Sequence, residues 1–211
     1  MKQFSMIFLA FMVIAISGCA QPKEIQLPDP IITGGMPLMD ALKNRKSARE
    51  FSDKNIDNQT LSNLLWAAFG YNRIDEKKRT APSANNKQEI EIYCAMRNGL
   101  FLWNPDRNVL IPIVEEDVRA KTGGQDYVAA AALNLIYVCN NDVYGGGMSD
   151  SRKNIVYVDT GYISENVYLF CASTGLSTVA RGFFDPVELS KTLSLPDSKW
   201  VVLTQSIGYP K

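Results

Sequence analysis

Apolar residues recur at helical spacing in three stretches of the chain, which we expect to form helices. Residues 36–44 carry a proline suited to a first helical turn, and residues 57–69 repeat leucine and alanine on one side before Gly70. Residues 163–174 are almost all apolar and end at Gly175. A helix that is apolar on every side is a buried one, so we expect this third helix at the centre of the domain.

Alternation of apolar and polar residues marks residues 89–97 as a strand. The Asn98-Gly99 pair predicts a type I′ turn and a hairpin with residues 100–103. Further strands are expected at residues 109–114, 133–139, 176–184 and 200–207, short helices at residues 115–121 and after Asp185-Pro186, a helix-prone segment at residues 127–132, and loops at residues 71–87 and 140–153. This order predicts an α+β fold with a mostly antiparallel central sheet, flanked by helices around the buried central helix.

The first residues have the pattern of an exported lipoprotein. Lys2 is followed by an apolar run over residues 6–16, which is too short to span a bilayer and has the length of a signal-peptide core. Two small residues precede Cys19 as in a bacterial lipobox, so we expect Cys19 to carry a lipid. Ala20 follows the cysteine, which by resemblance to such lipoproteins favours the outer membrane of the cell envelope. An ordinary signal peptide with an incidental cysteine is the alternative.

We therefore divide the chain into a signal peptide at residues 1–18, a lipidated tether at residues 19–35 and one domain at residues 36–211. The tether contains three prolines, ends in Gly34-Gly35 and shows no sustained period. The chain has 22 basic and 22 acidic residues, so its charge favours neither a nucleic-acid partner nor an electrostatic membrane patch. We expect membrane attachment through the lipid alone.

The remaining cysteines and the missing histidines limit the chemistry. Cys94, Cys139 and Cys171 are odd in number and lack metal-ligand spacing, so we expect buried free thiols, with a Cys94–Cys139 bridge as the alternative. The chain has no histidine, which excludes Ser-His-Asp and Cys-His catalysis and histidine-ligated zinc sites. An enzyme of this composition would take its chemistry from a cofactor.

Three cations and a hydroxyl lie within five residues after the first helix. Arg45, Ser47 and Arg49 alternate with Lys46, so in extended chain these three point the same way. A guanidinium offers a planar pair of donors that fits two phosphate oxygens, and a serine hydroxyl can bond a third. The alternative is a solvated helix end whose cations face the C-terminal helix dipole.

Several short motifs appear along the chain in a fixed order. They are Arg-Lys-Ser-Ala-Arg at 45–49, Leu-Leu-Trp-Ala-Ala-Phe-Gly at 64–70, Arg-Thr-Ala-Pro-Ser-Ala-Asn-Asn at 79–86, Glu-Asn-Val-Tyr-Leu at 165–169, Gly-Leu-Ser-Thr-Val at 175–179 and Gly-Tyr-Pro at 208–210. Their order and spacing from Met36 onward resemble the nitroreductase family, and the short branch related to SagB-type dehydrogenases most of all.

The resemblance implies non-covalent FMN at the interface of a homodimer that shares two flavin sites. The residues implied to contact FMN are Arg45, Ser47 and Arg49 at the phosphate and ribityl chain, Pro82, Ser83 and Asn86 from the partner subunit, and the stretch from Ala180 to Gly182 near flavin N5. From the residues themselves, Lys46 can help to neutralise the phosphate, and Gly175 and Gly182 allow the backbone to lie close to a flat ring. The family commonly has a further basic residue near the C-terminus, and here either Lys211 serves or the contact is missing.

The resemblance also implies an FMN-dependent oxidoreductase, with NAD(P)H as reductant. Hydride would pass between reduced flavin and a small organic acceptor such as a nitroaromatic or a quinone, and no protein base is required at flavin N5. Arg79 and Arg181 are expected to stabilise charge on the flavin or bind an anionic substrate, the alternative being that both face solvent. The alternative function is a non-catalytic flavin- or ligand-binding lipoprotein that retains the fold.

Overall fold

The computed structural model describes residues 23–145, 147 and 149–211, so the expected signal peptide and Cys19 lie outside the described residues. A seven-stranded sheet, in the order β1-β6-β5-β4-β7-β9-β8, forms the centre, and every neighbouring pair is antiparallel. Its strands are β1 (Ile25–Gln26), β4 (Ile90–Met96), β5 (Gly99–Asn104), β6 (Val109–Val114), β7 (Leu133–Asn140), β8 (Ser177–Arg181) and β9 (Lys199–Gly208). The predicted α+β fold with an antiparallel central sheet is confirmed.

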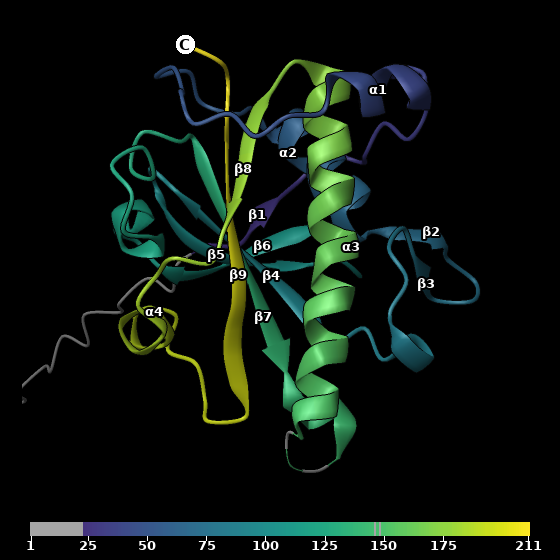
Figure 1. Ribbon diagram of the computed structural model, residues 1–211, viewed down its shortest axis with the longest axis vertical. Coiled ribbons are helices and arrows are strands. Elements are labelled where there is room, and N and C mark those ends of the chain that lie inside the picture. The colour runs from purple at the N-terminus through teal and green to yellow at the C-terminus, as the bar shows by residue number, and fades with distance from the viewer. Residues whose placement is uncertain (1–22, 146, 148) are drawn as a thin grey trace, which may run out of the picture.

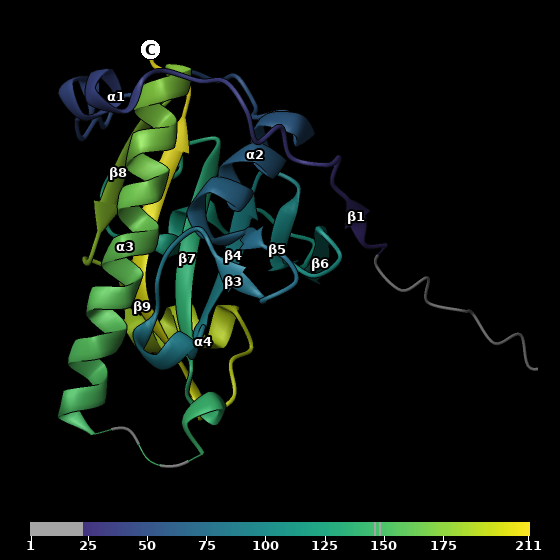
Figure 2. The same cartoon turned by 90° about the vertical axis from the view of Figure 1, so that its right-hand side faces the viewer.

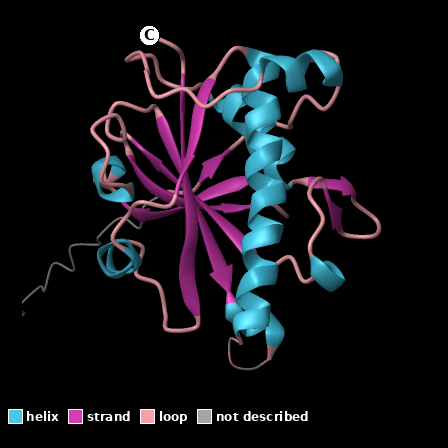
Figure 3. Ribbon diagram, in the orientation of Figure 1, coloured by secondary structure: helices cyan, strands magenta, loops and turns pink. Residues whose placement is uncertain are grey.

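Helices cover both faces of this sheet (Figures 1 and 2). They are α1 (Leu38–Asn44), α2 (Asn58–Phe69), α3 (Asp150–Thr174) and α4 (Pro186–Thr192), with the 3-10 turns η1 (Ala84–Asn86), η2 (Arg119–Thr122) and η3 (Asn141–Tyr144). Helices α2 and α3 pack on one face with the larger apolar core, and α4 and η2 pack on the other with a smaller one. Helix α1 packs on α3, and Figure 3 shows how α3 runs nearly the full length of the sheet.

Cap residues explain where the helices begin and end. Asp57 accepts the backbone N–H of Thr60 at the start of α2, and Asp185 accepts two backbone N–H groups at the start of α4. Gly175 ends α3 with φ +74°, a left-handed conformation that glycine adopts without strain. These ends follow the sequence pattern closely.

Helix α3 is longer than the predicted span of residues 163–174. It begins at Asp150, where the Ser149 side chain accepts the N–H of Arg152. The buried face of the helix mixes apolar residues with polar ones such as Asp159 and Thr160, which hides the helical period of its first half in the sequence. One side of that half is exposed, so α3 is buried along one face only.

The sheet extends into the segment that the sequence assigned to a tether. Ile25 and Gln26 pair with Leu110 and Val109, and Leu27 is 2 % exposed in the core. Ordered structure therefore begins before residue 36. A strand of two residues carries too little periodicity to be read from the sequence.

The β4–β5 hairpin is confirmed, but its turn is not of type I′. Met96 pairs with Gly99, so Arg97 and Asn98 form the turn, and neither has the positive φ that a type I′ turn requires. Gly99 has φ +140°, and a Cβ there would lie 2.5 Å from the carbonyl oxygen of Val114. The glycine is needed for that close approach.

Four other segments differ from the prediction. The expected loop at residues 71–87 contains a small antiparallel pair, β2 (Tyr71–Arg73) with β3 (Lys78–Arg79), and the turn η1. Residues 115–121 give only the 3-10 turn η2, residues 127–132 form no helix, and the first helix begins at Leu38. These segments are short and have only a weak local preference for helix or loop, so tertiary packing determines their secondary structure.

The three cysteines in the described part of the chain are buried and free, as expected, and they form no bridge with one another. Across the same residues, no helix combines the length and apolar character that crossing a membrane requires.

Candidate functional site

A cavity of about 670 Å³ lies at the C-terminal end of α3, where the segment after α1, the start of β8 and the C-terminal residues meet. Its lining contains three cations, one carboxylate, hydroxyls and backbone. The lining residues are Asn44, Lys46, Ser47, Ala48, Arg49, Glu50, Tyr168, Cys171, Ala172, Gly175, Leu176, Ser177, Thr178, Pro210 and Lys211.

The segment after α1 forms one wall because it leaves the helix in extended form. Arg45 at the helix end has φ −56° and ψ +123°, and the backbone N–H of Ala48 donates to the carbonyl of Thr178 at 2.9 Å. That bond holds residues 45–49 against the edge of β8, the last strand of the sheet. Residues 46–50 then line the cavity instead of covering a helix end.

The structure brings together five of the residues implied at the FMN phosphate and ring. Lys46, Ser47, Arg49, Gly175 and Lys211 all line this cavity. The cationic side chains give it a positive balance against the single carboxylate of its lining. Such a donor set suits an anionic group with several acceptor oxygens.

Arg45 lies beside the cavity rather than in its lining. Its guanidinium carbon is 5.3 Å from the centre of the Tyr168 ring, within cation–π distance. The Tyr168 hydroxyl is 2.9 Å from the Ser47 hydroxyl and accepts the backbone N–H of Ala180 at 2.9 Å. The sequence analysis placed Tyr168 in the Glu-Asn-Val-Tyr-Leu motif at 165–169 but assigned the side chain no role, because a tyrosine in an apolar run is equally consistent with a core position.

The residues implied as contacts from a partner subunit lie elsewhere. Pro82 and Ser83 line a second cavity of about 520 Å³ against the N-terminal half of α3. Asn86 has φ +53°, and its side chain accepts a hydrogen bond from Gln88. Within one chain these residues do not reach the cavity that holds Lys46 and Arg49.

Arg79 has partners inside the chain. Its guanidinium donates to the carbonyl of Phe69, to Gln88 Oε1 and to the Tyr71 hydroxyl, and it stacks on the Phe69 and Tyr71 rings at 4.6 and 4.3 Å. Burial lowers the pKa of Arg79 from its usual value. The side chain joins α2, β2 and the segment after η1, and its expected role at the flavin or an anionic substrate stays a prediction.

Arg181 is also enclosed, at 4 % exposure. It donates to the carbonyl of Thr122 at 2.8 Å and to Asn134 Oδ1 at 3.0 Å, and its Nε has no hydrogen-bond partner among the residues that the structure describes. Burial lowers the pKa of Arg181 to about 10. Alternation along β8 directs this side chain to the face of the sheet opposite α3, which corrects the expectation that it faces a ligand or solvent.

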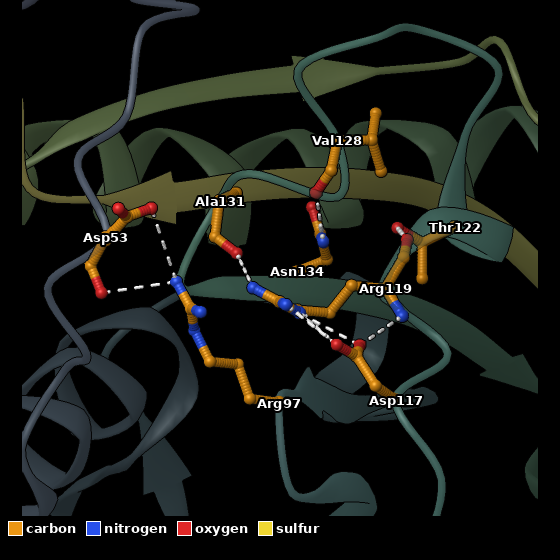
Figure 4. Close-up of polar contacts among 8 residues, drawn as sticks. All are labelled: Asp53, Arg97, Asp117, Arg119, Thr122, Val128, Ala131 and Asn134. Atoms are coloured by element: carbon orange, nitrogen blue, oxygen red, sulfur yellow. Dashed lines mark hydrogen bonds and ion pairs between the residues drawn. The ribbon is translucent and has the colours of Figure 1, made fainter. Parts of the chain in front are cut away.

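Figure 4 shows the polar groups on that face, with Thr122 and Asn134 near the ion pair of Arg119 and Asp117. The Nη2 atom of Arg119 lies 2.7 Å from the Oδ2 atom of Asp117, and Arg119 also donates to the carbonyl of Ala131 at 2.7 Å. Ala180, by contrast, offers its backbone toward Tyr168, and Gly182 beyond the strand is exposed.

Glu89 is a buried carboxylate that the sequence did not single out. The residue is 0 % exposed, and neither carboxylate oxygen has a hydrogen-bond partner in the described part of the chain. Burial, together with the nearby carboxylate of Asp159, raises the pKa of Glu89 to about 7. Asp159 itself accepts the backbone N–H of Ala84 at 2.8 Å and lines the second cavity.

Comparison with known proteins identifies a family for most of the chain. The model of the nitroreductase family matches residues 42–209. The chain therefore belongs to the nitroreductase family, which indicates flavin-dependent oxidoreduction.

Individual relatives agree with this family. The chain is 32 % identical over 189 residues to MJ1384 of Methanocaldococcus jannaschii, a provisionally named nitroreductase, covering 82 % of this chain and 91 % of that protein. It is 38 % identical to a provisionally named nitroreductase from Ralstonia eutropha JMP134, with TM-score 0.85 and 90 % of each chain covered. A structure from Anabaena variabilis shares the fold at 19 % identity and TM-score 0.76, covering 90 % of this chain and 42 % of that one.

Proposed function

We propose that this protein is an FMN-dependent oxidoreductase that transfers hydride between reduced flavin and a small organic acceptor, such as a nitroaromatic or a quinone. The observation that carries the proposal is the cavity at the end of α3, which collects Lys46, Ser47, Arg49 and Lys211. Its volume of about 670 Å³ lies within the range of cofactor pockets, roughly 300–1,000 Å³.

The donor set of this cavity fits the phosphate end of FMN. Lys46, Arg49 and Lys211 can neutralise a phosphate, and the Ser47 hydroxyl can bond one of its oxygens. Lys211 then takes the place of the family's basic residue near the C-terminus, as a more mobile point charge. Bound FMN supplies the hydride and electron chemistry, so the residues of this chain need only bind and orient it.

We propose a homodimer whose partner completes the flavin site through Pro82, Ser83 and Asn86. Two observations support it. These residues lie apart from the cationic cavity of their own chain, as contacts made to a second subunit must. Large apolar side chains are also exposed beside the second cavity on α3 and on α1, and burial between two copies would remove them from water. They are Leu38, Met39, Leu42, Ile155, Val158 and Tyr162.

We further propose that the protein is lipid-anchored through Cys19 in the outer membrane and draws its electrons from NAD(P)H. Support for the anchor comes from the sequence pattern around Cys19. The same pattern carries the protein out of the cytoplasm, where NAD(P)H is abundant, so the identity of the reductant has to be measured separately from flavin binding.

Stopped-flow absorbance of the flavin-loaded protein tests the proposal. Dithionite in one arm and NAD(P)H in the other should bleach the flavin, and a nitroaromatic or a quinone should restore its colour under anaerobic conditions. Flavin that is reduced by dithionite but passes its electrons to neither acceptor class would contradict an oxidoreductase of this kind. That result would favour a flavin-binding lipoprotein without turnover.

A further inference from the structure

The Tyr168 hydroxyl connects two walls of the cationic cavity. It accepts the backbone N–H of Ala180 on β8 and lies 2.9 Å from the Ser47 hydroxyl on the segment after α1. Its ring also lines the cavity, and the Arg45 guanidinium stacks on that ring at 5.3 Å. A single side chain therefore contacts β8, Ser47 and Arg45 together.

The hydrogen bonds of Tyr168 have a preferred direction. A tyrosine hydroxyl has one proton to donate and can accept as well, and the N–H of Ala180 already uses its acceptor capacity on one side. A phenol is a stronger acid than an aliphatic alcohol, so between Tyr168 and Ser47 the phenol is the better donor. Ser47 then accepts from Tyr168 and keeps its own proton free.

We propose that Tyr168 is a positioning residue that directs the Ser47 hydroxyl proton into the cavity, toward a phosphate oxygen of the cofactor. This inference rests on the proposed function, because it concerns how the same cavity holds FMN. Three groups donate in one sense, from the Ala180 N–H to Tyr168, from Tyr168 to Ser47, and from Ser47 to the phosphate. Hydrogen bonds aligned in this way polarise one another.

The two lysines of the cavity do not supply this directionality. Lys46 and Lys211 place a point charge on a flexible stem, which attracts a phosphate from many positions. Ser47 has a short side chain whose proton can rotate to several acceptors, so its direction depends on what its oxygen accepts. Tyr168 therefore acts on the phosphate of FMN and leaves the part of the ligand without phosphate unaffected.

The test uses four forms of the full mature protein, freed of flavin: wild type, Tyr168→Phe, Ser47→Ala and the double variant. FMN and riboflavin, which differ only in the phosphate, are titrated into each form by fluorescence quenching. Tyr157→Phe is the matched control, because it removes a phenol hydroxyl from an exposed position on the same helix. Phenylalanine keeps the ring that Arg45 stacks on, so the change is confined to the hydroxyl.

We expect Tyr168→Phe to weaken FMN about 5-fold and Ser47→Ala about 10-fold, the range of a net hydrogen bond. The double variant should bind FMN at most about 2-fold more weakly than Ser47→Ala does, because Tyr168 acts through Ser47. Riboflavin binding should stay unchanged in Tyr168→Phe, and Tyr157→Phe should bind both ligands as the wild type does.

Three results would overturn the inference alone: FMN binding to Tyr168→Phe at wild-type strength, an equal loss of riboflavin and FMN, or losses that multiply in the double variant. A Tyr168→Phe protein that binds neither ligand also contradicts it, since the hydroxyl is assigned to the phosphate only. Wild-type protein that binds neither FMN nor riboflavin contradicts the proposed function instead, so the two failures are distinguishable.

Discussion

Replacing Glu89 with glutamine should change how the stability of the protein depends on pH. Glu89 is 0 % exposed and its carboxylate has no hydrogen-bond partner among the described residues. The titratable groups that face it are Asp159 on α3, Tyr144 in η3 and Cys139 on β7. Burial and the Asp159 carboxylate disfavour the charged form, so in the folded protein Glu89 holds its proton to about pH 7.

The sign follows from linkage. The pKa of Glu89 is higher in the folded chain than its ordinary value of 4.5, so the folded state binds more protons between pH 4.5 and about 7. The stability that this group contributes is fully present below pH 4.5 and is lost as the pH rises toward 7. Above that the carboxylate is charged in both states and the loss is constant. Over the full pH range, the contribution of Glu89 to the free energy of unfolding falls by about 3 kcal/mol. Of this loss, about 2 kcal/mol falls between roughly pH 5 and pH 8.

Urea unfolding of wild type, Glu89→Gln and Glu116→Gln at about pH 5 and pH 8 measures this effect. Glutamine has the shape of a protonated glutamate and carries no charge at either pH. Relative to Glu89→Gln, the wild type should lose about 2 kcal/mol of unfolding free energy between the two pH values. Glu116 is exposed, so its variant should track the wild type at both. The reasoning would be refuted if the difference in unfolding free energy between the wild type and Glu89→Gln were the same at both pH values.

Three further predictions concern Arg181, the oligomer and the anchor. Arg181→Ala should lower the free energy of unfolding by about 2–4 kcal/mol, because it leaves the Thr122 carbonyl and Asn134 without a buried charged donor; urea unfolding within about 0.5 kcal/mol of wild type would contradict the buried network. Light scattering of the flavin-loaded protein should give twice the mass of one chain, and a stable flavin-loaded monomer at micromolar concentration contradicts the shared site. Cys19→Ser should abolish lipid labelling and release the protein from membranes, and labelling that persists in this variant contradicts the assigned anchor.

The sequence predicted most of the fold where local signals were strong. The helix starts expected near Asp57 and Asp185 and the helix end expected at Gly175 are confirmed by the structure. Alternating or continuous apolar runs gave the central strands, and β6 has the predicted bounds. In these segments local preference and tertiary packing agree.

Other elements could not be predicted because packing across the sheet decides them. The first half of α3 buries polar residues such as Asp159, so its period is invisible to a hydrophobicity pattern. Strand β1 is two residues long and exists only through its pairing with β6. The turn after β4 depends on the pairing of Met96 with Gly99 rather than on the Asn-Gly pair itself.

In the candidate site, too, some features were predictable from local sequence and others depend on contacts between distant segments. The cations after α1 were recognisable from their spacing, and the structure places Lys46, Ser47 and Arg49 in one cavity. The positions of Arg79 and Arg181 depend on which side of a strand or turn each side chain leaves, and on carbonyls that come from distant segments. Tyr168 was overlooked because its partners lie 121 and 12 residues away along the chain.

Titration of FMN into the purified, flavin-free protein tests the central claim most directly, with Lys46→Ala/Arg49→Ala as the site variant. Lys121→Ala/Lys191→Ala is the control, since it removes two exposed cations away from the cavity. We predict a yellow wild-type complex with one FMN per chain and an unchanged control. The site variant should bind FMN more weakly by about 3–6 kcal/mol, taking about 1.5–3 kcal/mol for each hydrogen bond to a charged group. Wild-type protein that remains colourless, or a site variant that binds FMN as tightly as the control, would contradict the assignment of this cavity to the flavin phosphate.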